Sequence, residues 1–106
     1  MPHPSAEAAP GTVRVRVRVP PALRALSGGR PAPWFDLGEA ATVDQLLDAV
    51  AADHPALERR IRDEQGALRP HVNLFLGDEN IRSLAGAATV LAPGDEVTIL
   101  AAISGG

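Results

Sequence analysis

Val13-Arg14-Val15-Arg16-Val17-Arg18-Val19 is the stretch that decides the fold, because apolar and charged side chains alternate along it without interruption. Successive side chains of a β-strand point to opposite faces of a sheet, so this period of two predicts a strand with four Val on a buried face and three Arg on the other. Pro20 and Pro21 follow, and proline has no N–H to donate to a strand ladder. The strand is therefore expected to end at Val19.

Three more segments are predicted to be strands, namely residues 34–37, 71–76 and 96–101. Each is rich in β-branched, aromatic or other apolar residues, and the last follows the turn sequence Ala92-Pro93-Gly94-Asp95. Alternation within the second of these segments turns Phe75 away from the face that is expected to be buried.

A helix is predicted to begin after Thr42, because Thr42-Val43-Asp44-Gln45 matches a capping box. Apolar residues then recur at helical spacing. The residue before a proline disfavours the helical region, so His54-Pro55 should end the helix. Residues 56–63 are predicted to form a second short helical segment, which Gly66 ends.

The order of these elements, strand, strand, helix, strand, strand, predicts an α+β fold of the β-grasp (ubiquitin-like) type. Its mixed sheet of four to five strands would carry one main helix across one face. We expect residues 1–12 to be a flexible leader, residues 13–106 to form one domain, and residues 102–106 to be the flexible C-terminal tail of that domain. The core is expected to contain Val15, Val17, Leu46, Leu47, Val50, Leu74, Val97 and Ile99.

Composition argues against several classes of protein. A formal net charge of −3 disfavours a general nucleic-acid binder, which needs concentrated positive charge. No apolar run approaches the ~18 residues of a membrane span, and the start of the chain lacks a signal-peptide pattern, so a cytoplasmic protein is expected. Cysteine is absent and the histidines are scattered, which argues against a metal site. No nucleophile, base and orienting group converge in a motif, so we expect neither an enzyme nor a bound cofactor.

Two groups of side chains outside the expected core have alternative interpretations. Phe75 and Leu100 point away from the core face, so they form either a partner-docking patch or a second small core under the loop of residues 27–33. The three Arg of the first strand form either a surface for an acidic partner or a solvated face balanced by nearby acidic side chains, and the solvated face is favoured.

Three segments carry a family resemblance. They are Val72-Asn73 followed by Gly77-Asp78-Glu79-Asn80-Ile81-Arg82, then Pro93-Gly94-Asp95-Glu96-Val97-Thr98-Ile99-Leu100, and finally Ser104-Gly105-Gly106. A terminal Gly-Gly alone is a weak signal, but here a turn and a strand precede it at a defined spacing. Together the segments resemble the MoaD/ThiS family of ubiquitin-like bacterial sulfur carriers, and within it the CysO-type branch. The resemblance covers nearly all of residues 13–106.

The resemblance implies that the chain is a protein co-substrate and not a catalyst. An ATP-dependent, MoeB/ThiF-like enzyme would adenylate the Gly106 carboxylate, which would then be converted to a thiocarboxylate. Glycine at positions 105 and 106 has no side chain to clash in a narrow channel. At ~3.3 Å per residue, an extended segment from Ala101 to Gly106 would reach roughly 20 Å from the sheet.

The implied partners are the adenylating enzyme and a sulfur-acceptor synthase similar to cysteine synthase, with cysteine biosynthesis as the leading pathway. The resemblance also allows a metalloprotease that releases the product. On the carrier itself, partner binding is assigned to Phe75, Leu100, Ile103 and Ser104. No nucleic acid and no membrane are expected among the partners.

Other functions stay open on the sequence alone. The sulfur could serve molybdopterin, thiamine or secondary-metabolite synthesis instead of cysteine synthesis. The chain could also be a protein modifier that forms an isopeptide bond through Gly106, or a β-grasp interaction module in which the Gly-Gly has no role.

Overall fold

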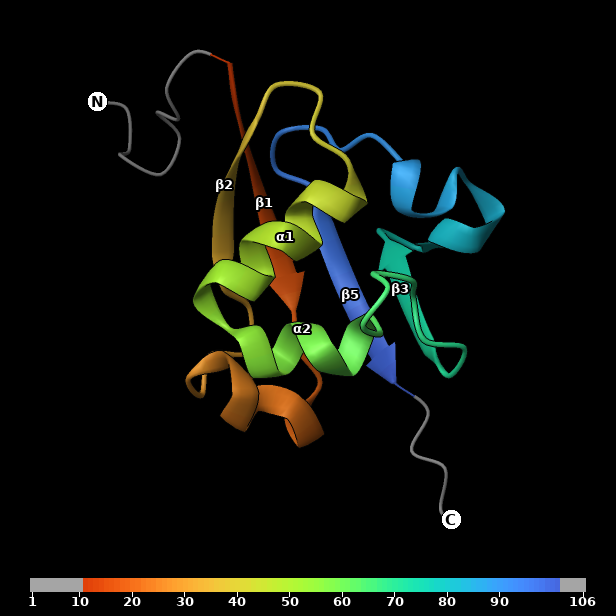
Figure 1. The fold of residues 1–106 in the computed structure, drawn as a ribbon. Helices are drawn as coiled ribbons and strands as arrows, with labels where there is room; N and C mark the ends of the chain where they lie inside the picture. Colours follow the sequence, from red (N-terminus) through yellow and green to blue (C-terminus); the bar gives the residue numbers. More distant parts are fainter. Residues whose placement is uncertain (1–10, 102–106) are drawn as a thin grey trace, which may run out of the picture.

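A five-stranded mixed sheet forms the centre of the computed structural model, which describes residues 11–101 (Figure 1). The strand order is β2-β1-β5-β3-β4, so the first and last strands of the chain are neighbours in the middle. These two strands run parallel, and the other pairs are antiparallel. The strands are β1 (Thr12–Arg18), β2 (Trp34–Gly38), β3 (Val72–Leu76), β4 (Glu79–Asn80) and β5 (Glu96–Ala101).

Both α-helices cover the same face of this sheet, as Figure 1 shows. The helices are α1 (Val43–Asp53) and α2 (Pro55–Ile61). No α-helix of residues 11–101 covers the other face, which is called the open face below. Shorter 3-10 helices span Pro21–Ser27, Ile81–Ser83 and Gly86–Ala88 in the connections. This is the predicted β-grasp arrangement, with a second helix in addition to the main one. Among residues 11–101, neither helix has the length and apolar character needed to cross a bilayer.

The predicted capping box starts α1. The Gln45 amide donates to Thr42 Oγ1 at 3.3 Å, and Gln45 Oε1 accepts from the Thr42 amide at 2.9 Å. His54 ends the helix as expected. The second helix ends earlier than predicted, at Ile61, because Arg62 adopts an extended backbone.

The apolar face of the helices and the helix-covered face of the sheet meet in one core. All eight predicted core residues are buried, and the largest side chains among them are fully enclosed. Leu57 and Ile61 of α2 and Ile81 also belong to this core. Burial of such side chains is the main favourable contribution to folding, so the helix-covered face of the sheet is the part that holds the fold together.

The start of β1 differs slightly from the expected one. Thr12 already belongs to β1 and pairs with Gly38, one residue before the predicted start. Residues 1–10 of the predicted leader and residues 102–106, the predicted tail, lie outside the described residues.

Candidate functional site

The described chain ends at the last residue of a central strand. β5 lies between β1 and β3, and its final residue, Ala101, pairs with Val72. β1 pairs with residues 96–98 of β5, whereas β3 pairs with residues 97–101, so the end of β5 is held by its antiparallel pairing with β3. The predicted reactive residues Gly105 and Gly106, and the predicted contact residues Ile103 and Ser104, lie outside the described residues.

Arg82 holds the start of β3, where Val72 pairs with Ala101. Its Nη2 donates to the Val72 carbonyl oxygen at 2.8 Å and lies 3.4 Å from the Arg69 carbonyl oxygen. A hydrogen bond from a charged donor to a carbonyl is stronger than one from a neutral donor. Arg82 therefore ties the start of β3, where Ala101 pairs, to the segment that precedes β3.

The residues around Arg82 explain part of the family-like motif. Asn80 Oδ1 accepts from the Arg82 amide at 2.9 Å, and Asn80 Nδ2 donates to Asn73 Oδ1 at 3.1 Å. Ile81 between them is fully buried. The motif residues therefore hold β3, β4 and the turn after them in place, and sequence reasoning had used them only as a signature.

On the open face, the two predicted docking residues lie on adjacent strands. Phe75 is opposite Thr98 and Leu100 is opposite Asn73, so Phe75 and Leu100 are diagonal neighbours on the face away from the helices. Leu100 is 48% exposed, whereas Phe75 is only partly exposed. The prediction that both side chains point away from the core is correct, but only Leu100 is exposed, whereas Phe75 is half-buried.

The alternative that Phe75 packs beneath the loop of residues 27–33 is wrong. The carbonyl oxygens of Pro31 and Pro33 in that loop accept from the amides of Val19 and Val17, so the loop borders β1. β3, which carries Phe75, is separated from β1 by β5.

A second group of side chains occupies the β1–β2 half of the open face. The guanidinium carbons of Arg14 and Arg16 lie 5.4 and 5.1 Å from the centroid of the Trp34 ring, within the range of cation–π contact. The sequence reading had assigned Trp34 only to a strand. The signal was available, because alternation with buried Phe35 places Trp34 on the same face as these Arg.

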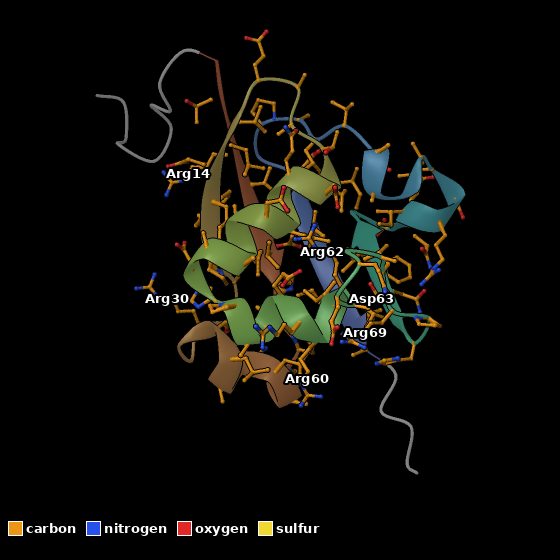
Figure 2. The ribbon with its side chains drawn as sticks, in the orientation of Figure 1. Arg14, Arg30, Arg60, Arg62, Asp63 and Arg69 are labelled. Carbon is orange, nitrogen blue, oxygen red and sulfur yellow. The ribbon has the colours of Figure 1, made fainter. Side chains whose placement is uncertain are left out.

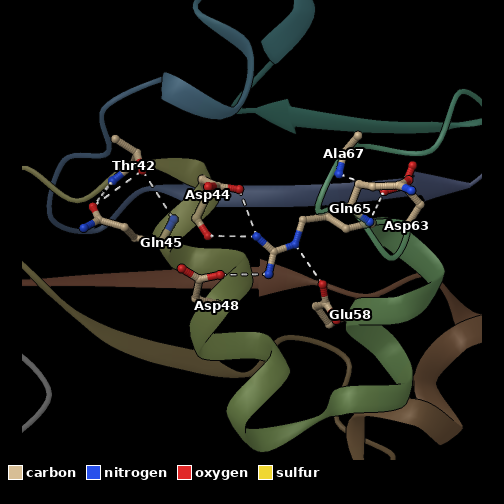
Figure 3. Close-up of polar contacts among 9 residues, drawn as sticks. Thr42, Asp44, Gln45, Asp48, Glu58, Asp63, Gln65 and Ala67 are labelled. Atoms are coloured by element: carbon tan, nitrogen blue, oxygen red, sulfur yellow. Dashed lines mark hydrogen bonds and ion pairs between the residues drawn. The ribbon is translucent and has the colours of Figure 1, made fainter.

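The most connected ionic cluster lies at the helices and was not predicted. The Arg62 guanidinium contacts Asp44 and Asp48 of α1, both at 2.9 Å, and Glu58 of α2 at 2.8 Å. Figure 3 labels these three acidic residues and marks their contacts with dashed lines. Burial alone would lower the pKa of Arg62, but hydrogen bonds to Asp48, Glu58 and Asp44 outweigh it and raise that pKa. Arg62 is thus charged at ordinary pH and joins the two helices.

The ThiS family model matches residues 17–106. Sulfur carrier protein CysO of Mycobacterium tuberculosis is 33% identical over 96 residues, which are 89% of this chain and all of CysO. Its crystal structure has a TM-score of 0.71 at 32% identity, covering 84% of this chain and 99% of that chain.

Two further relatives share the fold. Small archaeal modifier protein 1 of Haloferax volcanii is 39% identical over 71 residues, which are 67% of this chain and 77% of the relative. A crystal structure of that protein has a TM-score of 0.75 at 30% identity, covering 88% of this chain and 99% of that chain. A structure of the Amycolatopsis orientalis BexX/CysO complex matches with a TM-score of 0.74 at 32% identity, over 87% of this chain and 99% of that one. With the family model matched over most of the sequence, the chain belongs to the ThiS/MoaD family of ubiquitin-like sulfur carriers.

Proposed function

We propose that this carrier transports sulfur as a thiocarboxylate on Gly106. The observation that carries the proposal is the position of β5, a central strand whose last residue, Ala101, is five residues before Gly106 in the sequence. A rigid strand followed by a short segment that ends in two glycines can present one carboxylate at a set distance from a folded body.

The chemistry needs activation, because a carboxylate oxygen is a poor leaving group. A Gly106 carboxylate oxygen attacks the α-phosphorus of ATP and pyrophosphate leaves, which gives an acyl-adenylate. Hydrosulfide then attacks the acyl carbon and AMP leaves, which gives the thiocarboxylate. ATP is bound by the partner enzyme, so the carrier needs no cofactor of its own and acts as a co-substrate.

Cysteine biosynthesis is the proposed pathway, supported by the similarity to CysO along most of the chain. The partners are then a MoeB/ThiF-like adenylating enzyme and an acceptor similar to cysteine synthase, with a metalloprotease to release the product. Such ATP-dependent enzymes place the carrier in the cytoplasm. Molybdopterin, thiamine and secondary-metabolite synthesis are the alternative acceptor pathways. The BexX/CysO complex is relevant to these alternatives, because it contains a CysO protein in another assembly.

A second candidate function is protein modification. It is supported by the similarity to small archaeal modifier protein 1, whose name assigns it that role. Here the same Gly106 acyl-adenylate would be attacked by an amine of another protein and an isopeptide bond would form. The carrier has Arg but no Lys, so its side chains offer no amine for a chain of modifiers.

Intact-mass spectrometry tests the proposal directly. The carrier is incubated with the ThiF-family enzyme of the same genome, ATP and sulfide, and we expect a mass increase equal to the exchange of one oxygen for sulfur. A chain that lacks Gly106 is the matched control. It should keep the unfolding free energy of the full chain but show no exchange. Exchange in the deleted chain would refute the role of Gly106, and conjugates to other proteins without exchange would favour the modifier function.

A further inference from the structure

Trp34 lies on a surface that has no role in the proposed chemistry at Gly106. Its side chain is 44% exposed, although aromatic rings are among the residues that gain most from burial. It is the only tryptophan of the chain. The ring lies at the β2 edge of the open face and takes part in a shallow pocket. The lining residues of this pocket are Arg14, Arg30, Pro31, Ala32, Pro33 and Trp34.

Two arginine side chains contact the Trp34 ring, and ion pairs restrain the arginines of β1. Arg16 Nε and Nη2 lie 3.0 and 2.9 Å from Glu96 Oε2, and Arg18 Nη1 lies 3.7 Å from the same oxygen. Arg14 and Arg16 both contact the Trp34 ring. Side chains that are already restrained lose less conformational entropy when a ligand binds, so this arrangement is prepared for recognition.

The charge of this region is opposite to that of the whole chain. Arg14, Arg16, Arg18 and Arg30 contribute four positive charges, and within residues 11–101 ion pairs join Arg14 to Asp36 and both Arg16 and Arg18 to Glu96. The net charge of the chain is −3. The positive charge is thus concentrated at one edge of the open face, and Figure 2 shows Arg14 and Arg30 on the β2 side of the molecule.

We propose that this basic-aromatic surface, formed by Arg14, Arg16, Arg18, Arg30 and Trp34, binds a carboxylate-rich segment of the adenylating enzyme that receives the tail. The inference rests on the proposed function. Glutamate or aspartate side chains would pair with the guanidinium groups, and an apolar or proline side chain beside them would lie on the Trp34 ring.

The location suits a partner that also holds the tail. Arg16 is in register with Trp34 on one side and Glu96 on the other. Leu100 lies four residues beyond Glu96 on β5, about 13 Å along the strand at the rise of an extended chain. A standard interface of about 800 Å² per partner would cover both places, so one enzyme surface can contact the basic-aromatic surface and the start of the tail.

The test measures binding at Trp34 itself. The full-length carrier is labelled with fluorotryptophan, which gives one fluorine NMR signal, and is titrated without ATP with the ThiF-family enzyme of the same genome. We expect the signal to shift. The double variant Arg14→Glu with Arg18→Glu is compared by calorimetry with a matched control, Arg59→Glu with Arg60→Glu, which makes the same charge change at exposed positions on α2. We expect the first to bind at least about tenfold more weakly and the control to bind as the unmodified carrier does.

Three results would overturn the proposal. They are equal binding by both double variants, no binding by the unmodified carrier, and a shift of the Trp34 signal with a single-stranded oligonucleotide but not with the enzyme. The outcome is separable from that of the thiocarboxylate. If sulfur exchange occurs with the same KM for both double variants, the docking surface is refuted and the sulfur chemistry stands. If binding depends on the Arg residues but no exchange occurs, the docking surface stands and the thiocarboxylate is refuted.

Discussion

The two faces of the central sheet have opposite chemistry although they come from the same strands. In β1, Val13, Val15 and Val17 are buried beneath the helices, while the Arg between them lie on the open face. In β5, Ile99 is buried and Leu100 is exposed. A shift of one residue in register would exchange these sets, so the pattern fixes both the core and the recognition surface at once.

This difference separates stability from recognition. Residues on the helix-covered face contribute mainly through apolar burial, and their loss should weaken folding. Residues on the open face contact solvent or one another at the surface, where ion pairs add little to stability. Substitutions on the open face should therefore affect partner binding more than folding, and the following variants test that division.

The largest expected effect on stability is at Leu47 and Ile99, which are both fully buried. Truncation of either side chain to Ala removes apolar contacts and leaves a cavity, which costs about 2–5 kcal/mol. Chemical denaturation of each variant would measure the loss. A loss below about 1 kcal/mol for both would contradict the assigned division of the faces, because such a value is typical of a surface position.

Much of this division could be predicted from the sequence. Alternation in β1 and the capping box of α1 are local patterns, and both predict the structure correctly. The Arg62 cluster could not be found in this way, because Arg62 meets Asp44 and Asp48 only after α2 packs beside α1. The same holds for Arg82, whose acceptors precede it by ten residues or more and are brought close by the β3–β4 turn.

Trp34 shows a different limit. Its face was predictable from alternation, but its contact with Arg14 and Arg16 depends on the antiparallel register of β1 and β2. Gly105 and Gly106 are singled out only by the family-like motifs. The proposed chemistry takes place on a partner enzyme, and such chemistry would leave no cluster of catalytic groups in the carrier's own sequence.

Arg62 tests whether ionic contacts on the helix side also stabilise the fold. Its side chain is 8% exposed, and Arg62→Ala leaves three carboxylates near one another without their cation. Loss of a buried partner costs several kcal/mol, but Asp44 and Asp48 can be hydrated again, so we expect about 2 kcal/mol. Denaturation at low and high salt measures it, and the loss should shrink at high salt because repulsion among the carboxylates is screened. An unchanged midpoint would show that the cluster adds nothing.

Phe75 and Leu100 test the open face in the opposite way. Phe75→Ala and Leu100→Ala should each weaken binding to the adenylating enzyme by ~1–2 kcal/mol, a ~5–30-fold change, because exposed apolar side chains near the tail can anchor a partner. Calorimetric titration measures this effect, and both variants should unfold at denaturant concentrations closer to the unmodified carrier than the Leu47 and Ile99 variants do. Normal binding together with easy unfolding would assign these residues to the fold instead.

Substitution of Arg82 has the smallest expected effect on stability. Arg82 lies at the end of the sheet and belongs to neither face's main surface. Arg82→Ala removes its donors from the Val72 and Arg69 carbonyls, but water can replace them at an exposed site, so we expect a loss of about 1 kcal/mol. The local effect should be larger than the global one. Amide hydrogen exchange should rise at the ends of β3 and β5, where Val72 pairs with Ala101, and stay unchanged at the β1–β2 pair. Arg82→Lys keeps the charge but not the planar donor group, so its amide exchange should lie between that of the unmodified carrier and that of Arg82→Ala. If exchange at the β3–β5 end is the same in all three proteins, the strand pairing alone fixes the departure point of the tail, and Arg82 has no part in positioning it.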